Sequence, residues 1–281
     1  MTSFFKLIKR KYVTAAAWRP FLGGFKDWLL ACFLHFCGRK SVLFRTLEVP
    51  LRPKNESRPV YCRPGTSDFV TFQEIFFNEE YRLAREIPVT DVRGILDLGA
   101  NVGLAARWFL LRFPHARIVG VEPDAANAAL ARRNLMATES NSRHRIIHAF
   151  AGGASRNAFL SSSGDYDANE GILQDTPLAG RAAVPVFTGA ELCDLAACAL
   201  DIAKIDIEGS EKELLEADVG WLCDFRWIFI EVHDPLDERW LASIISQRLP
   251  TWEVARTERR HAGAFLAFLR NRQAVSENPC G

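Results

Sequence analysis

From residue 94 onward, short apolar runs alternate with longer amphipathic segments. The apolar runs are five or six residues long and suit strands that are buried on both faces of a sheet. They are Gly94–Leu98, Arg117–Val121, Arg145–Phe150, Asp201–Ile205 and Trp227–Val232. Helical spacing of apolar residues marks Leu104–Phe113, Ala125–Leu135, Ser210–Leu215 and Leu236–Gln247. This alternation predicts an α/β fold with a parallel sheet between two layers of helices.

The end of the chain departs from the alternation. Trp252–Thr257 and Ala264–Leu269 flank a turn that contains His261 and Gly263, which predicts an antiparallel hairpin. We therefore expect a doubly wound, mostly parallel seven-stranded sheet with a C-terminal antiparallel hairpin.

Further elements are expected outside this sheet. The patterns at Ala158–Ser161 and Ala182–Phe187 predict two short additional strands, and Val70–Leu83 predicts a helix. Four prolines between residues 50 and 64 predict an extended segment that divides the chain. We expect a helical N-terminal extension at residues 1–50, one large domain at residues 51–270 and a loose tail at residues 271–281.

The N-terminal extension is basic and rich in aromatic residues. Its acids are Asp27 and Glu48, and its cations are Lys6, Lys9, Arg10, Lys11, Arg19, Lys26, Arg39, Lys40 and Arg45. Its longest apolar run, Trp28–Cys37, has ten residues, whereas a membrane span needs roughly twenty. Such a composition suits a helical cap on the large domain, which we favour, or peripheral contact of residues 1–45 with the inner face of a membrane.

The composition indicates which classes of partner and which cellular compartment to expect. The formal net charge of +1 gives no reason to expect a nucleic-acid partner. The seven cysteines are scattered without metal-ligand spacing, so we expect no cysteine metal site and a reducing, cytoplasmic location. The sequence is silent on the oligomeric state.

The strongest motif is GILDLGANVG at residues 94–103, in which a strand leads into an acid and two glycines. A turn that leaves the first strand of a doubly wound sheet lies where ligands bind. Its glycines, Gly99 and Gly103, are four positions apart, whereas a dinucleotide turn has GxGxxG spacing to close on a pyrophosphate. Asp97 beside this turn would repel a phosphate and would suit S-adenosylmethionine (SAM), which carries an ammonium and a sulfonium. Capping of the next helix by Asp97 is the structural alternative.

The second strand ends in VGVEPD at residues 119–124. Glu122 offers two carboxylate oxygens to the two ribose hydroxyls of a nucleoside, and Pro123 stops the strand. No acid follows the third strand, where His148–Gly152 stands. We therefore expect backbone groups and apolar side chains to hold the adenine. A solvent-exposed strand end is the alternative for Glu122.

Acids and a histidine follow the fourth and fifth strands, in KIDIEGSE at residues 204–211 and IFIEVHD at residues 228–234. Methyl transfer to a hydroxyl needs alignment and a base. His233 suits the base, and Asp206 could orient or deprotonate the acceptor instead. Glu208 would help shape the acceptor side, whereas we assign Glu211 to the helix start, where negative charge is favourable. We expect no metal, although this set could hold a divalent cation.

These motifs resemble those of the FkbM family of SAM-dependent methyltransferases. ILDLGANVG (95–103), VEPD (121–124), KIDIEGSE (204–211) and IEVHD (230–234) carry the resemblance. The segment at residues 63–81 is also similar to the element that precedes the first strand in this family. The resemblance covers roughly residues 60–270 and implies a class I methyltransferase sheet.

The resemblance implies O-methylation of a sugar, glycan or polyketide-like acceptor. On this reading, the residues that hold SAM are Asp68, Asp97, Gly99, Asn101, Gly103, Glu122 and Pro123, and the acceptor side consists of Asp206, Glu208 and His233. A nucleotide-dependent oxidoreductase and a non-catalytic interaction module with the same fold are the alternatives.

Overall fold

The computed structural model describes residues 16–37, 46–136, 143–162, 171–260 and 263–273. Several predictions therefore lie outside the described residues. They concern most cations of the N-terminal extension, His261 in the hairpin turn and the end of the tail from residue 274.

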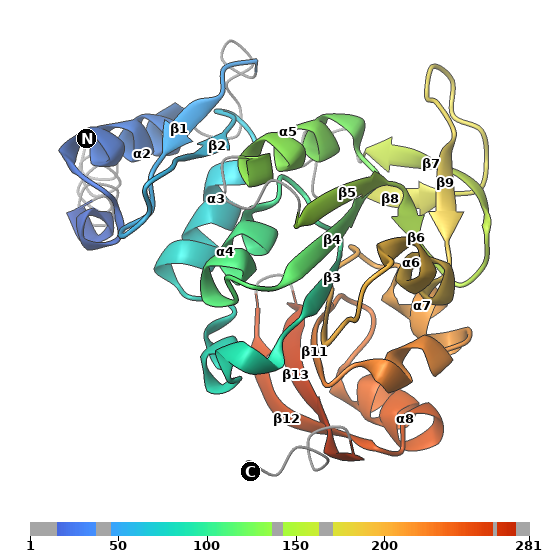
Figure 1. Ribbon diagram of the computed structural model, residues 1–281. Helices are drawn as coiled ribbons and strands as arrows, with labels where there is room; N and C mark the ends of the chain where they lie inside the picture. Colours follow the sequence, from blue (N-terminus) through green and yellow to red (C-terminus); the bar gives the residue numbers. More distant parts are fainter. Residues whose placement is uncertain (1–15, 38–45, 137–142, 163–170, 261–262, 274–281) are drawn as a thin grey trace, which may run out of the picture.

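A mixed sheet of seven strands forms the centre of the molecule, in the order β12-β13-β11-β10-β3-β4-β5 (Figure 1). The expectation of seven strands is confirmed. The strands are β3 (Gly94–Leu98), β4 (Arg117–Glu122), β5 (His144–His148), β10 (Ile202–Ile205), β11 (Trp227–Val232), β12 (Trp252–Arg259) and β13 (Phe265–Asn271). The first five pair in parallel, and β13 pairs antiparallel with both β11 and β12. The carboxyl ends of β3, β4, β10 and β11 consequently share one edge of the sheet.

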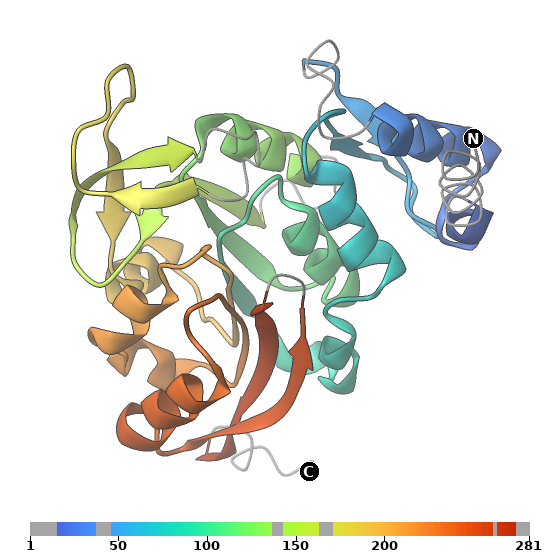
Figure 2. The same cartoon turned by 180° about the vertical axis from the view of Figure 1, so that it is seen from behind.

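Both faces of the sheet are buried. Alternate residues of each strand point to opposite faces, so neighbouring residues of one strand join different apolar clusters. On β3, Ile95 joins one apolar cluster, whereas Leu96 and Leu98 join another. The first cluster includes residues of α4 (Leu104–Arg112) and α5 (Ala125–Met136). The second includes residues of α6 (Gly189–Ala196), α7 (Glu211–Glu216) and α8 (Glu238–Arg248). Figures 1 and 2 show these two helical layers on either side of the sheet.

A second sheet lies beside the carboxyl edge of the first. Its strands are β6 (Phe150–Ala151), β7 (Arg156–Ser162), β8 (Gly171–Gln174) and β9 (Val184–Phe187), in the order β6-β9-β7-β8. The predicted strand Arg145–Phe150 is wrong in its extent, because the chain leaves the central sheet after His148 and pairs with β9 from Phe150. The strand run therefore belongs to two sheets, which apolar periodicity could not reveal.

The segment before β3 is more irregular than the predicted helix Val70–Leu83. It contains α3 (Asp68–Phe72), a π-helical turn η3 (Gln73–Phe77) and the 3₁₀ turns η4 (Arg82–Glu86) and η5 (Val89–Asp91). The helix ends early because Glu79 adopts a left-handed φ of 52°. The predicted helix is therefore confirmed over residues 70–77 and is wrong in its extent beyond Phe77.

The N-terminal extension contacts the large domain across the predicted boundary at residue 50. It contributes η1 (Arg19–Phe21), α2 (Phe25–Cys37) and β1 (Val49–Leu51), and β1 pairs antiparallel with β2 (Val60–Cys62). Among the described residues, no helix has both the length and the apolar composition needed to cross a bilayer.

Replacement of Phe229 by alanine tests the aromatic packing that supports the central sheet. Its fully buried ring lies 4.8 Å from that of Phe268 and 5.7 Å from that of Phe109, between centroids. We expect Phe229→Ala to lower the free energy of unfolding by about 3–5 kcal/mol in urea denaturation, because it leaves a cavity. Leu111→Ala, at an exposed position of α4, should change it by less than about 1 kcal/mol. Equal losses in the two variants would contradict this account.

Candidate active site

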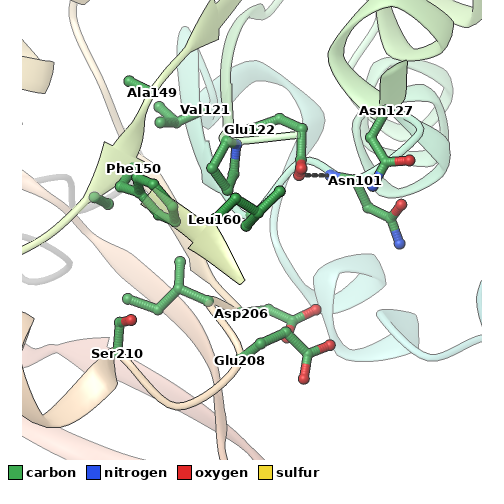
Figure 3. A pocket seen from close by; sticks show the side chains of 14 residues that line it. Asn101, Val121, Glu122, Asn127, Ala149, Phe150, Leu160, Asp206, Glu208 and Ser210 are labelled. Carbon is green, nitrogen blue, oxygen red and sulfur yellow. Dashed lines mark hydrogen bonds between the residues drawn. The ribbon is translucent and has the colours of Figure 1, made fainter. Parts of the chain in front are cut away.

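A cavity of about 570 Å³, including its open mouth, lies at the carboxyl edge of the central sheet. It is lined by the turn after β3, the end of β4, α5, the segment that leads from β5 into the second sheet, the second sheet itself and the turn after β10 (Figure 3). The lining residues are Gly99, Asn101, Val121, Glu122, Pro123, Asn127, Ala149, Phe150, Ala151, Leu160, Asp206, Ile207, Glu208 and Ser210.

The turn after β3 depends on its two glycines. Gly99 has a φ of 77°, and a Cβ there would lie 1.7 Å from the carbonyl oxygen of Asp206. Gly103 has a φ of 78°, and a Cβ there would lie 3.0 Å from Ala131 Cα. Gly99 therefore lets the turn approach the end of β10, and Gly103 lets the start of α4 approach α5. Gly99 and Asn101 line the cavity, whereas Gly103 belongs to the same turn but does not line the cavity.

Glu122 is a buried carboxylate in the cavity wall. Its Oε2 accepts a hydrogen bond of 2.8 Å from the amide of Asn101, and its Oε1 accepts one of 2.9 Å from the amide of Asp124. Burial raises the pKa of Glu122 to about 7, although these amide bonds oppose the shift. Each oxygen has a further lone pair, so both could also accept a hydroxyl. Pro123 follows in the cavity wall, where its carbonyl oxygen lies 2.9 Å from His148 Nε2.

Asp97 is fully buried, and it lies outside the cavity lining. Its Oδ1 lies 3.1 Å from Lys204 Nζ, which also donates to the carbonyl oxygen of Gly99 at 2.6 Å. Burial raises the pKa of Asp97, whereas Lys204 opposes the shift. The charge of Asp97 is thus compensated within the protein, and its contact with a cofactor stays a prediction. The sequence analysis missed Lys204, whose signal is a cation within the apolar run of β10.

Asp68 is also fully buried away from the cavity lining. Its Oδ2 accepts hydrogen bonds from the amide of Arg63 at 2.8 Å and from Arg63 Nε at 2.9 Å. Arg63 Nη2 in turn donates to Asn127 Oδ1 at 2.6 Å, and Asn127 lines the cavity. Asp68 therefore reaches the cavity through Arg63 and Asn127. Asn127 was missed in the sequence analysis because it belongs to no recognisable motif.

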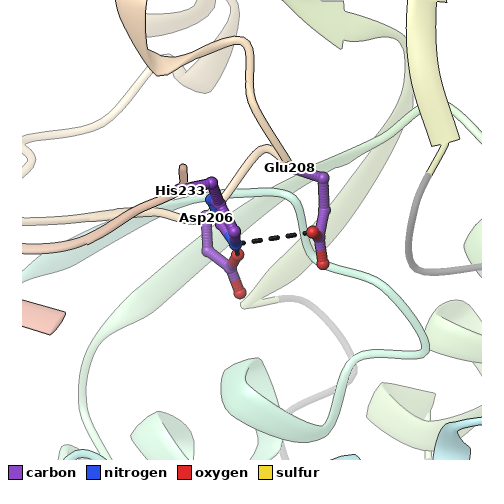
Figure 4. Close-up of side chains that lie close together, drawn as sticks. All are labelled: Asp206, Glu208 and His233. Atoms are coloured by element: carbon purple, nitrogen blue, oxygen red, sulfur yellow. Dashed lines mark ion pairs between the residues drawn. The ribbon is translucent and has the colours of Figure 1, made fainter. Parts of the chain in front are cut away.

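His233 lies among four carboxylates at the ends of β10 and β11. Its Nε2 is 3.4 Å from Glu208 Oε2 and 3.8 Å from Asp206 Oδ1, and Figure 4 shows these three side chains together. The same nitrogen is 3.9 Å from Glu231 Oε1. His233 Nδ1 lies 2.9 Å from Glu211 Oε1. The three predicted acceptor-side residues are thus brought together, and Glu211 and Glu231 complete the group.

The carboxylates govern the protonation of this group. Burial opposes the charge on His233, but Glu211, Asp206 and Glu208 together raise its pKa to about 9. Burial and the neighbouring Asp206 raise the pKa of Glu208 to about 8 and that of Glu231 to about 8. The imidazole is therefore mostly protonated at neutral pH, unlike the unperturbed histidine assumed from the sequence.

Asp206, Glu208 and His233 each offer an oxygen or nitrogen within 4.8 Å of one another, which is close enough to hold a cation. All three side chains are partly exposed, and exposed acidic groups commonly converge without a metal. The expectation of no metal stays a prediction.

A family model for the methyltransferase FkbM domain matches residues 97–273, more than half of the chain. The match includes the turn after β3 that lines the cavity and the ends of β4, β10 and β11.

The chain belongs to the FkbM methyltransferase family. The resemblance in the motifs is therefore confirmed. A methyltransferase family also implies the use of SAM.

Solved structures are similar to the chain at low sequence identity. Methyltransferase FkbM from Methylobacillus flagellatus KT has 19% identity and a TM-score of 0.47 over 72% of this chain and 53% of that one. The chain thus spans about half the length of that protein. A putative rRNA methylase from Clostridium thermocellum has 8% identity and a TM-score of 0.45 over 69% of this chain and 94% of that one. Cofactor-bound Rv0187 from MTB has 16% identity and a TM-score of 0.44 over 69% and 80%. Among curated proteins, none matches the chain.

Glu122→Gln tests the role of the cavity carboxylate in cofactor binding. Only the deprotonated carboxylate can accept hydrogen bonds from two ribose hydroxyls with both oxygens. Since the pKa of Glu122 is about 7, SAM affinity should rise from pH 6 to pH 8 and then level off. Glu122→Gln should weaken binding roughly 10-fold or more at pH 8 and lose most of this pH dependence. Isothermal titration calorimetry measures both effects.

Glu216→Gln, at an exposed site on α7, is the matched control and should bind SAM like the unmodified chain. Any change in the protonation of SAM itself affects binding to all three proteins equally. A pH dependence that is the same in Glu122→Gln and in the unmodified chain would contradict the assignment.

Proposed function

We propose that the chain transfers the methyl group of SAM to a hydroxyl of a sugar, glycan or polyketide-like acceptor. The observation that carries this proposal is that Asp206 and Glu208 line the cavity and also face His233 Nε2. The cavity and the carboxylates around His233 Nε2 therefore share two residues. A hydroxyl placed between them would have a methyl donor on one side and proton acceptors on the other.

The cavity offers distinct surfaces to the parts of SAM. We assign the ribose to Glu122 and the amino-acid end to the turn at Gly99 and Asn101. Phe150 and Leu160 form an apolar wall that suits the adenine, as the absence of an acid after β5 predicts. Bound SAM would supply an electrophilic methyl group to this site.

The residues at the strand ends would position and deprotonate the acceptor. The hydroxyl oxygen would take the methyl group that SAM supplies as the carbon–sulfur bond breaks, and its proton would pass to a base of the chain. His233 accepts this proton at Nε2 when the imidazole is neutral, and Asp206 and Glu208 hold the hydroxyl towards the methyl group. The products are a methyl ether, S-adenosylhomocysteine and a protonated base.

The remaining expectations on partners extend this proposal. We assign the N-terminal extension the role of a helical cap, which its β1–β2 pairing supports, with peripheral membrane contact as the alternative. We expect no nucleic-acid partner, and we expect the protein to act in the cytoplasm.

Transfer of labelled methyl groups tests the proposal. The purified chain, incubated with methyl-labelled SAM and a glycan and metabolite extract, should produce a labelled methyl ether identifiable by mass spectrometry. Asp206→Asn should lower the yield at least roughly 10-fold while SAM affinity changes little, because the substitution leaves the ribose site intact. SAM binding without label transfer to any fraction would favour the non-catalytic module, and absence of SAM binding by folded protein would refute the proposal.

Removal of metals tests the expected absence of a cation. Dialysis against a chelator should leave label transfer unchanged, because the chain itself supplies the proton acceptors. Loss of transfer on chelation and its recovery with Mg²⁺ or Mn²⁺ would show that the expectation is wrong.

A further inference from the structure

Glu211 is a buried carboxylate with an unusual set of donors around one oxygen. Its side chain is 0% exposed, and its Oε1 lies 2.9 Å from His233 Nδ1. The same oxygen accepts hydrogen bonds from the amides of Ile207 at 3.3 Å and Gly209 at 3.2 Å. Within the described part of the chain, its ion pair is with His233. A buried carboxylate requires such partners, because desolvation of an unpaired charge costs several kcal/mol.

This contact selects one form of the imidazole. A deprotonated carboxylate can only accept, so Nδ1 of His233 must be the donor. In the neutral imidazole the other nitrogen, Nε2, then carries the lone pair. Nε2 is the nitrogen that faces Glu208 and Asp206, both of which line the cavity.

The same carboxylate holds the turn that carries Glu208. Glu208 has a φ of 51° and Gly209 a φ of 94°, so the turn follows a left-handed path that an ordinary residue rarely adopts. The amides on either side of Glu208 both donate to Glu211. A shift of Glu211 would therefore displace the imidazole and this part of the cavity wall together.

We propose that Glu211 is the positioning residue of the acceptor side, which fixes His233 with a proton on Nδ1 and holds the 206–210 turn against it. Nε2 is thereby the nitrogen that takes the proton of the acceptor hydroxyl. The role of Nε2 as proton acceptor rests on the proposed methyl transfer, whereas the position of the proton on Nδ1 does not. The proton moves from the hydroxyl oxygen to Nε2 as the oxygen–carbon bond forms and the carbon–sulfur bond breaks.

The competing explanation is that Glu211 only supplies negative charge at the start of α7. The first turn of α7 contains a second acid, Glu213, which provides a matched control. Glu213 is partly exposed and pairs with Arg156 at 2.7 Å. A helix-start role predicts similar consequences for Glu211→Gln and Glu213→Gln.

The other charged groups around His233 are unchanged in sequence in both variants. Asp206 and Glu208 face the ring from the turn after β10, and Glu231 faces it from β11. Behind them, Lys204 pairs with Asp206 at 3.5 Å, and Glu80 and Arg260 act on the charge of Glu231. A change in His233 that occurs in Glu211→Gln alone therefore reports the loss of Glu211, through its contact with the imidazole and through the turn that it holds.

Nitrogen-15 NMR of the full chain with labelled histidine reads the imidazole directly. The chain has six histidines, so the signal of His233 is assigned by its loss in His233→Gln. In the unmodified chain we expect titration near pH 9 and, above it, a neutral ring protonated at Nδ1. Glu211→Gln should lower the titration midpoint by roughly one pH unit or more, and Glu213→Gln should leave it unchanged.

Two results would overturn the proposal. One is a neutral ring protonated at Nε2 in the unmodified chain, a measurement that decides the matter even if Glu211→Gln does not fold. The other is an equal change of the midpoint in Glu211→Gln and Glu213→Gln. Neither measurement needs an acceptor, so a chain with the expected tautomer that binds no SAM would refute the proposed function and leave the positioning role intact.

Discussion

The site depends on the ammonium group of Lys204, which is buried within the central sheet. Lys204 lies opposite Asp97 in the parallel register of β10 and β3, and its Nζ also reaches the carbonyl oxygens of Leu98 and Gly99. Burial alone would lower the pKa of Lys204, but Asp97 and Asp206 together raise it above its ordinary value. A buried ammonium is tolerated only with such partners. Lys204 thereby joins the turn of the proposed cofactor site to Asp206 on the proposed acceptor side.

The second constraint is the concentration of like charge at the ends of β10 and β11. Parallel strands bring their carboxyl ends to one edge, so Asp206, Glu208 and Glu231 meet around a single imidazole. Their partial burial is costly, and it raises the pKa values of Glu208 and Glu231 into the neutral range. Groups that titrate near neutral pH can exchange protons with a bound molecule, and such groups gather at functional sites.

The cavity itself is built from two sheets, and its buried carboxylate and its aromatic side chain come from different sheets. The central sheet supplies the carboxylate of Glu122, whereas β6 and β7 of the second sheet supply Phe150 and Leu160. This separation suits a ligand with a polar ribose and a flat aromatic base. It arises where the chain leaves β5 after His148 and enters β6 at Phe150.

The sequence by itself determined the alternation of strands and helices that builds the central sheet, the glycine turn after β3 and the residues at the strand ends. Apolar periodicity and glycine spacing are local properties, and parallel pairing necessarily brings strand ends to one edge. Only the tertiary structure decided the partners of buried charges, because these lie far apart in the chain. Asp97 meets Lys204 across the sheet, Asp68 acts through Arg63, and Glu211 contacts His233 rather than only starting a helix. Whether a charge faces a ligand or another side chain depends on which groups share its burial, and no local pattern encodes that.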